Sequence, residues 1–257
     1  MRPKEPDTSL RQRAQSLGLQ GLLSHWDQVC TAPWLAELLG WEEQERAQRG
    51  LTRRLSAARL GRFRLMADFD WTHPRKLDRE AVEDHLRGDF VEQQENLIIM
   101  GPNGVGKTML AQNVCYHSVL RGVPTLFTTA SALLADLSQR HSGHALQQRL
   151  RYYARPKLLA IDEIGYLSYD ARSADLLFEV VTRRYQRAST VVTTNKPFAQ
   201  WHEIFPNASC VVTLIDRLTH QAEVLQIDAD SYRLKEARAR STERSAKRAA
   251  RKKAAKQ

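Results

Sequence analysis

A glycine-rich string of eight residues most constrains what this chain can fold into. Residues 101–108 read Gly-Pro-Asn-Gly-Val-Gly-Lys-Thr, which matches the pattern G-x-x-x-x-G-K-[ST] of a phosphate-binding loop. The apolar run Leu97–Met100 precedes this string, and the helix-compatible run Lys107–Val119 follows it. A strand, a phosphate-binding loop and a helix in this order predict the first unit of an α/β domain that binds a nucleotide.

The residue types in this loop each have a chemical reason. Gly104 and Gly106 permit backbone conformations that direct successive N–H groups at one anion. The N-terminus of the following helix adds partial positive charge. We expect Lys107 to reach the β- and γ-phosphates of ATP, and the Thr108 hydroxyl to ligate Mg²⁺. The predicted nucleotide-binding residues of this segment are Gly101, Pro102, Asn103, Gly104, Val105, Gly106, Lys107, Thr108 and Met109.

Two adjacent acids follow a second apolar run. The run Leu158–Ile161 leads directly into Asp162 and Glu163. Ligands of open α/β sheets bind at the carboxyl ends of the strands, so Asp162 and Thr108 are expected to come together there. We expect Asp162 to hold Mg²⁺ directly or through water, and Glu163 to orient and polarise the attacking water. A solvated turn is the alternative for two adjacent acids, and the apolar run before them disfavours it.

A third polar group ends another strand candidate, at Thr193-Thr194-Asn195. We expect Asn195 to hydrogen-bond the attacking water or the γ-phosphate. An ordinary turn is the alternative, because asparagine commonly follows strands in turns. The two motifs described above favour the functional interpretation.

Short apolar runs alternate with helical segments from residue 96 onward. The strand candidates are Leu97–Met100, Thr125–Phe127, Leu158–Ile161, Thr190–Thr194 and Val224–Ile227. The helix candidates are Lys107–Val119, Ala130–Gln139, His144–Tyr153, Ala171–Arg187 and Trp201–Ile204. Several of the strands are continuously apolar, as expected when both faces of a parallel sheet are buried. The alternation predicts an α/β fold with a five-stranded parallel sheet.

Three regions of the chain differ in composition. Residues 1–64 carry leucines at helical spacing, which predict a small helical N-terminal domain. We expect this domain to bind DNA or a partner protein. Residues 65–234 contain the phosphate-binding motifs. Residues 235–257 contain ten Lys or Arg and two Glu, a net +8 of the +10 carried by the whole chain. We expect this tail to be disordered, and either merely solvated or in contact with the phosphate backbone of DNA.

Composition also argues against several classes of protein. The hydrophobic content of 42% favours a folded chain. Apolar runs of about 18 residues are absent from the sequence, so a membrane-spanning helix is not expected. The polar start lacks the apolar segment of a secretory signal. The three cysteines, Cys30, Cys115 and Cys210, are far apart in the sequence and are expected to be reduced thiols in a cytoplasmic protein.

Together these strings resemble the AAA+ ATPases of the initiator and helicase-loader clade, and most closely the IstB-like transposition helper proteins of insertion sequences. The matching stretches are residues 68–71, 101–108, 158–167, 193–198, 215–220 and 231–233. They keep the order of the family across residues 65–234. Many NTPases share the phosphate-binding loop, whereas the strings Asp-Glu-Ile-Gly-Tyr-Leu and Asp-Arg-Leu-Thr-His are much more specific to this family.

The resemblance implies roles for three further side chains. Asn195 would be the sensor 1 residue. Arg217 would be an arginine finger, which stabilises the phosphoryl group of ATP held by a neighbouring subunit. An ordinary surface pair with Asp216 is the alternative for Arg217. Arg233 resembles the sensor 2 arginine and is added to the nucleotide-binding residues, although the chain lacks room after it for the usual helical lid.

A DNA contact is also implied, because an extra helix after the second strand contacts DNA in this clade. The corresponding segment here is Ala130–His141. A basic and aromatic stretch follows it, with Arg149, Arg151, Tyr152, Tyr153 and Arg155. A solvated helix with a linker is the alternative interpretation of this segment.

The function that the resemblance implies is an ATP-dependent helper of transposition. Such a protein assembles head-to-tail into homo-oligomers on double-stranded DNA and recruits or activates an IstA-like transposase. A DnaC-like loader of the replicative helicase is the alternative within the clade, with the same chemistry and a different partner. A stand-alone kinase is disfavoured by the basic tail and Arg217. A DNA-binding module with a degenerate ATP site is disfavoured because Lys107, Thr108, Asp162 and Glu163 are all present.

Overall fold

The computed structural model describes residues 7–140, 142–166, 169–206 and 208–254. The chain divides into two compact units, one up to residue 54 and the other from residue 55 onward. This division precedes the boundary after residue 64 that composition suggested. It falls inside helix α4 (Leu35–Ala58), which continues through Gly50. A glycine inside a helix costs only about 1 kcal/mol, so neighbouring helix formers can carry the helix across it.

The first unit is helical, as predicted. It contains α1 (Asp7–Ser16), α2 (Gln20–Ser24), α3 (Trp26–Val29) and the first part of α4. Its core is a small apolar cluster of buried side chains, namely Ala14, Leu17, Trp26, Leu35 and Leu39. A two-pronged ion pair from Arg13 to Glu43 joins α1 to α4, with N···O distances of 2.7 and 2.8 Å.

The second unit is built on a five-stranded sheet with the order β2-β3-β4-β1-β5. The strands are β1 (Asn96–Met100), β2 (Thr125–Thr129), β3 (Leu158–Ile164), β4 (Ser189–Thr194) and β5 (Ala222–Gln226). All of the pairings are parallel, and β1 lies between β4 and β5. The predicted parallel α/β sheet is therefore confirmed. The carboxyl ends of β1, β3 and β4, which carry the predicted motifs, meet at one edge.

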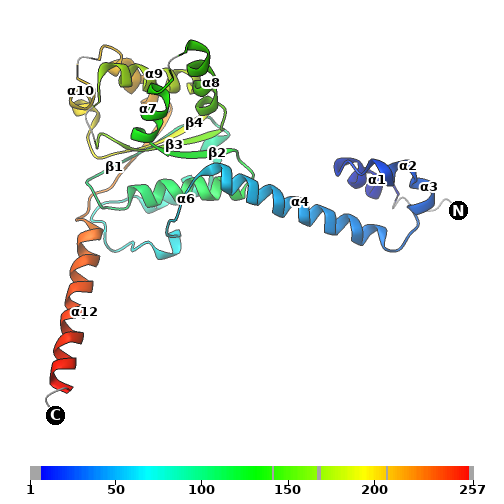
Figure 1. The fold of residues 1–257 in the computed structure, drawn as a ribbon, viewed down its shortest axis with the longest axis horizontal. Coiled ribbons are helices and arrows are strands. Elements are labelled where there is room, and N and C mark those ends of the chain that lie inside the picture. Colours follow the sequence, from blue (N-terminus) through cyan, green and yellow to red (C-terminus); the bar gives the residue numbers. More distant parts are fainter. Residues whose placement is uncertain (1–6, 141, 167–168, 207, 255–257) are drawn as a thin grey trace. The chain divides into compact units, whose positions relative to one another are not determined.

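Helices cover both faces of the sheet (Figure 1). Helix α6 (Lys107–Leu120) lies on one face, and α7 (Ala130–Ser138), α8 (Gly143–Ala154) and α9 (Ala171–Arg184) lie on the other. The side chains of Leu159, Ile161 and Val192 join the core under α7 to α9. The remaining elements are α5 (Arg79–Arg87), α10 (Trp201–Ile204), α11 (Val211–Thr219), α12 (Tyr232–Ala254) and three short 3-10 helices at Met66–Asp68, Asp89–Val91 and Phe198–Gln200. Helix α11, which carries Arg217, was not among the helices expected from the sequence.

Helix α12 differs from the disordered tail that composition suggested. Residues 232–254 are helical, and residues 255–257 lie outside the described part of the chain. Alanine, arginine, lysine and glutamate are strong helix formers, so the same composition that suggested a solvated tail also favours a helix. The Ser231 hydroxyl accepts a hydrogen bond from the N–H of Leu234 at 3.3 Å and caps the first turn. In the described residues, α12 and the other helices are too short or too polar to span a membrane.

The pairing of β3 with β4 contains an irregularity at the edge that carries the motifs. Ile161 pairs with Val192 and Ile164 pairs with Thr194, so that Asp162 and Glu163 together oppose one residue of β4. An extra residue of this kind is a β-bulge, which bends the strand and redirects its side chains.

Candidate nucleotide-binding site

A pocket of about 470 Å³ lies at this edge of the sheet. Most of the residues predicted from the sequence line it, namely residues 103–109 together with Glu163, Asn195 and Arg233. The remaining predicted residues are placed differently. The ammonium group of Lys107, which lines the pocket, donates hydrogen bonds to the carbonyl oxygens of Gly101 and Pro102. The hydroxyl of Thr108, also in the lining, donates to the carboxylate of Asp162. Arg217 is not part of the lining.

The loop after β1 requires glycine at two positions. Gly104 and Gly106 have φ angles of 81° and 105°, which side-chain-bearing residues rarely adopt. A Cβ atom on Gly104 would lie 2.4 Å from Oγ of Ser231, and one on Gly106 would lie 3.1 Å from the ring of Phe69. Helix α6 begins directly after Gly106. The loop and the helix N-terminus together have the geometry of an anion site.

The ammonium group of Lys107 lies against the loop. Its Nζ donates hydrogen bonds to the carbonyl oxygens of Gly101 at 2.7 Å and Pro102 at 2.6 Å. Burial lowers the pKa of Lys107, and the negative charge of Asp162 acts in the opposite direction. A cation held beside the N-terminus of α6 is placed to bind phosphate oxygens.

The two predicted magnesium ligands lie in contact. The hydroxyl of Thr108 donates to Oδ1 of Asp162 at 3.2 Å, and the Asp162 side chain is buried, with 2% of its surface exposed. A hydroxyl and a carboxylate beside a phosphate site are oxygen ligands of the kind that Mg²⁺ prefers. These residues therefore fit the Mg²⁺ ion that accompanies a nucleoside triphosphate.

The other two polar groups predicted from strand ends reach the same pocket. Glu163 is exposed there and has a φ of 63°. Within the described residues, Oδ1 of Asn195 is buried and has no hydrogen-bond partner. Such atoms are rare in folded proteins and need an explanation. Asn195 lines the pocket, but its Oδ1 lies beneath the surface, 3.0 Å from the position that a Cβ atom on Gly165 would take, so its contact with the attacking water stays a prediction.

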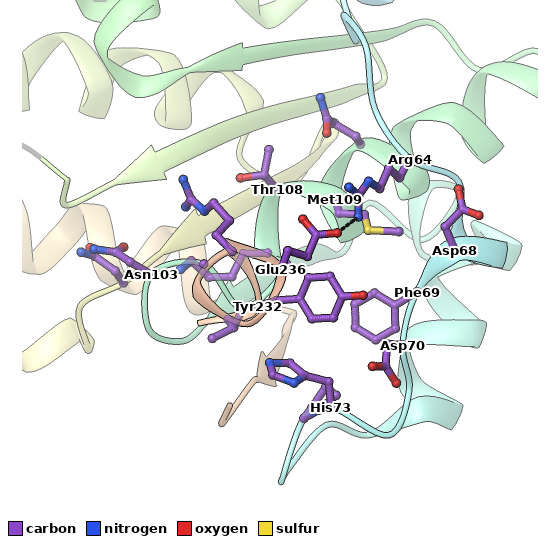
Figure 2. Close-up of a pocket in the computed structure, with 18 of the residues that line it drawn as sticks. Arg64, Asp68, Phe69, Asp70, His73, Asn103, Thr108, Met109, Tyr232 and Glu236 are labelled. Atoms are coloured by element: carbon purple, nitrogen blue, oxygen red, sulfur yellow. Dashed lines mark hydrogen bonds and ion pairs between the residues drawn. The ribbon is translucent and has the colours of Figure 1, made fainter. Parts of the chain in front are cut away.

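The opposite wall of the pocket is formed largely by residues outside the predicted site; for Phe69, the sequence leaves base contact and packing equally open. The residues of this wall come from the segment before α5 and from the start of α12 (Figure 2). Nη1 of Arg64 contacts Oε1 of Glu236 at 2.6 Å, and Nζ of Lys235 contacts Oδ2 of Asp70 at 3.0 Å. Hydrogen bonds from Thr72 and Lys235 lower the pKa of Asp70 to about 2, so this carboxyl stays ionised at neutral pH.

Aromatic rings make up much of the same wall. Phe69 packs edge-to-face on Trp71 with ring centroids 4.9 Å apart, and His73 packs on Tyr232 at 5.0 Å. Of these rings, Phe69, His73 and Tyr232 line the pocket. Flat apolar surfaces of this kind can hold a nucleobase beside the phosphate loop. The strings at residues 68–71 and 231–233 were the available sequence signal, but nothing in their spacing shows that they meet.

The exposed Arg233 stands at the phosphate end of the pocket. Its Nε lies 3.5 Å from the position that a Cβ atom on Gly104 would take. Its positive charge also contributes to the lowered pKa of Lys107, after burial. A role of Arg233 in phosphate binding stays a prediction.

Arg217 lies apart from the pocket of its own chain. The guanidinium group of Arg217 donates a hydrogen bond to the hydroxyl of Thr182 in α9. It also lies over the rings of Phe178 at 4.7 Å and Tyr185 at 5.7 Å. No ion pair joins it to Asp216 in the part of the chain that the structure describes. The surface-pair alternative is therefore absent from this conformation.

Several charged and aromatic side chains of the segment predicted to contact DNA, residues 130–155, bond to one another within the chain. Asp136 in α7 pairs with Arg140 and Arg149 and accepts a hydrogen bond from the hydroxyl of Tyr153 at 2.7 Å. Burial and the contact with Asp136 raise the pKa of Tyr153 to about 12. Arg149 also lies 3.9 Å from the centre of the Tyr152 ring. The exposed cations of the stretch are then Arg151 and Arg155, while His141 lies outside the described residues.

Comparison with known proteins gives the family of the chain. The model of the IstB-like ATP binding protein family matches residues 12–240. The chain belongs to this family. One relative within it is the protein of insertion sequence IS21 from Pseudomonas aeruginosa, which is named for ATP binding. The two are 38% identical over 205 residues, which are 80% of this chain and 77% of that protein. The IS5376 protein of Geobacillus stearothermophilus is 33% identical and covers 82% of this chain and 84% of its own length.

Solved structures with a similar fold include two proteins named DnaI and DnaA. DnaI has a TM-score of 0.53 at 19% identity, covering 67% of this chain and 90% of its own. AMPPCP-bound DnaA from Aquifex aeolicus has a TM-score of 0.50 at 19% identity, covering 64% of this chain and 50% of its own. At these identities the likeness shows the fold alone. The fold and family inferred from the sequence are thus confirmed, and ATP binding follows from the family.

Proposed function

We propose that this chain is an ATPase that binds double-stranded DNA, assembles on it head-to-tail and recruits or activates a transposase. One observation carries the proposal that the chain hydrolyses ATP. The hydroxyl of Thr108 contacts the carboxylate of Asp162 next to the glycine-rich phosphate loop, and Glu163 is exposed beside them. Membership in the IstB-like family and relatives named for insertion sequences support the transposition part.

Each polar group at the pocket has a part in the proposed hydrolysis. Lys107 and the loop N–H groups bind the phosphates of ATP. Thr108 and Asp162 would hold Mg²⁺, which withdraws negative charge from the phosphate oxygens when bound. Glu163 orients the attacking water and accepts its proton, and Asn195 accepts a hydrogen bond from the same water.

A neighbouring subunit completes the proposed site. Arg217 is held on α9 and α11, outside its own pocket, and an arginine finger acts on a nucleotide bound by another chain. Head-to-tail contacts of this kind are heterologous and build rings or helical filaments. ATP between subunits would then strengthen the assembly on DNA, and hydrolysis would weaken it.

The proposal is tested by the nucleotide dependence of DNA binding. Mg²⁺ with a non-hydrolysable ATP analogue is expected to tighten binding to duplex DNA and to enlarge the assembly, whereas ADP should do neither. Fluorescence anisotropy of labelled duplex and analytical ultracentrifugation measure the two effects. The same DNA affinity with the analogue, with ADP and without nucleotide would contradict an ATP-dependent helper.

Helix α12 supplies a second expectation about DNA. Removal of residues 238–257 is expected to weaken binding to all duplex sequences alike and to flatten its salt dependence. The reason is that each lost phosphate contact lowers the slope of log affinity against log salt by about 0.9. The truncation keeps Lys235 and Glu236, which hold the pocket wall. Anisotropy titrations at several salt concentrations measure the slope, and an unchanged slope would show that the basic arm is only solvated.

The same chemistry would serve a helicase loader, and the names of the relatives support a transposase as the partner. The compared proteins with 30% identity or more are named for insertion sequences. The likeness to DnaI is at 19% identity and concerns the fold. We therefore favour a transposase as the partner.

A further inference from the structure

A single buried hydroxyl lies between the two acids of the site. Thr193 in β4 has 1% of its surface exposed. Its Oγ1 lies 2.9 Å from the backbone nitrogen of Glu163 and 2.5 Å from Oδ1 of Asp162. A backbone N–H can only donate, so the Thr193 hydroxyl accepts a hydrogen bond from Glu163. The same hydroxyl donates a hydrogen bond to the Asp162 carboxylate. One hydroxyl therefore bonds to both acids at once.

The bulge explains why one residue can reach both acids. Asp162 and Glu163 together oppose the single residue Thr193, between the pairs Ile161 with Val192 and Ile164 with Thr194. Adjacent residues of a regular strand face opposite sides of the sheet, so one acid would point away from the pocket. With the bulge, both acids lie at the pocket edge of the sheet. Asp162 contacts Thr108, and Glu163 is exposed in the pocket lining.

The backbone of Glu163 needs support in this position. Its φ of 63° is in the left-handed region, which is unfavourable for a residue with a side chain. The hydrogen bond from its N–H to Thr193 stabilises this conformation. The same hydroxyl also partners the Asp162 carboxylate, which is buried and requires hydrogen bonds.

From this geometry we infer that Thr193 is a positioning residue for ATP hydrolysis. Its hydroxyl sets the direction of the Asp162 carboxylate toward the metal position and holds the backbone turn that presents Glu163 to the pocket. The inference rests on the proposed ATPase function and adds a residue to it. Replacement of a partner that orients a metal ligand typically costs about 10- to 100-fold in metal affinity or activity.

The test compares variants that differ in the hydroxyl alone. Thr193→Val keeps the shape of the side chain and removes the hydroxyl, whereas Thr193→Ser keeps the hydroxyl and removes the methyl group. Thr125→Val is the matched control, because Thr125 is a buried strand threonine whose hydroxyl donates to the Val123 carbonyl at 3.1 Å. The Thr125 side chain is not part of the pocket lining.

Mn²⁺ affinity and kcat report on the positioning of the two acids, and analogue binding without a metal ion reports on whether the pocket is intact. Mn²⁺ is titrated into each full-length protein with a saturating non-hydrolysable ATP analogue and followed by electron paramagnetic resonance. Thr193→Val is expected to weaken Mn²⁺ binding and to lower kcat, each by about 10- to 100-fold. Binding of the analogue in EDTA should match the wild type, because the phosphate loop is intact. Thr193→Ser and Thr125→Val should resemble the wild type in both measurements.

Other outcomes overturn the inference. Thr193→Val with wild-type Mn²⁺ affinity and kcat would show that the hydroxyl positions neither acid. A loss in Thr193→Ser as large as that in Thr193→Val would show that the site responds to any change of this buried side chain and not to the hydroxyl alone. If Thr193→Val fails to fold, Thr193→Ala and Thr193→Ser make the same comparison, with only the serine variant expected to keep Mn²⁺ affinity. A wild-type protein that binds Mn²⁺ with the analogue and does not hydrolyse ATP contradicts the proposed ATPase, while the Mn²⁺ titration still tests Thr193.

Discussion

Glu163→Gln protein is expected to bind ATP as the wild type does and to hydrolyse it about 10²- to 10⁴-fold more slowly, the usual contribution of a general base. Glutamine keeps the size of the side chain but cannot accept the proton of the attacking water. Thr108 and Asp162 are untouched, so binding with Mg²⁺ is retained. Lys107→Ala protein should show the opposite pattern and lose measurable ATP binding, because its ammonium group lies over the phosphate loop. Steady-state phosphate release and titration with a fluorescent ATP analogue measure the two effects.

Matched controls exclude effects of general charge loss on these two variants. Lys157→Ala removes an exposed lysine just before β3, and Glu80→Gln removes an exposed acid in α5. Both control proteins should bind and hydrolyse ATP normally. Wild-type turnover by Glu163→Gln protein would remove Glu163 from its assigned role, and normal ATP binding by Lys107→Ala protein would exclude the loop from phosphate binding.

Arg217→Ala protein is expected to bind ATP normally and to hydrolyse it about 10³-fold more slowly, at the lower end of the range for arginine fingers. Its own pocket is intact, because the Arg217 side chain is packed against Phe178 and Thr182 outside the lining. The loss would arise at the nucleotide of the neighbouring subunit. Arg217→Lys should also be slow, because an ammonium group cannot form the two-pronged contact of a guanidinium.

A mixing experiment shows whether the site is shared between chains. Arg217→Ala protein has an intact pocket, and Lys107→Ala protein has an intact arginine. A mixture of the two inactive proteins should regain part of the wild-type activity on DNA, because one chain supplies the nucleotide site and the other supplies the finger. Arg87→Ala serves as the control, since Arg87 pairs with Asp84 on α5 and lies outside the pocket lining. Normal hydrolysis by Arg217→Ala protein, or co-assembled variants without restored activity, would favour a monomeric NTPase.

The parts of the site that could be predicted are those whose functional residues are close together in the sequence. The loop at residues 101–108 carries its own glycines, lysine and threonine, and the acids at 162 and 163 follow their strand directly. The parallel sheet could also be predicted, because continuous apolar runs indicate strands that are buried on both faces. The two motifs favoured a functional interpretation of Asn195, whereas resemblance to a family supplied that of Arg217, and both roles stay predictions.

The parts that could not be predicted depend on contacts between distant segments. Arg64 meets Glu236, and Lys76 pairs with Asp228 through the backbone, across long stretches of sequence with no shared pattern. The proposed positioning role of Thr193 depends on a one-residue shift in strand register, which period-2 patterning does not encode. Composition also could not decide between helix and disorder for the basic tail, because its residues favour both.

The start of α12 bears on how these proteins can be divided into interchangeable parts. The backbone N–H of Tyr232 donates to the carbonyl oxygen of Gly104 at 2.9 Å, and the hydroxyl of Ser231 occupies the space beside that glycine. The first turn of the basic helix is thus a wall of the candidate nucleotide pocket. A chimera that exchanges C-terminal arms between relatives therefore keeps its nucleotide site only when the junction falls after Glu236. The positive charge of the arm, which starts at Arg233 and Lys235, thus begins before the pocket wall ends at Glu236.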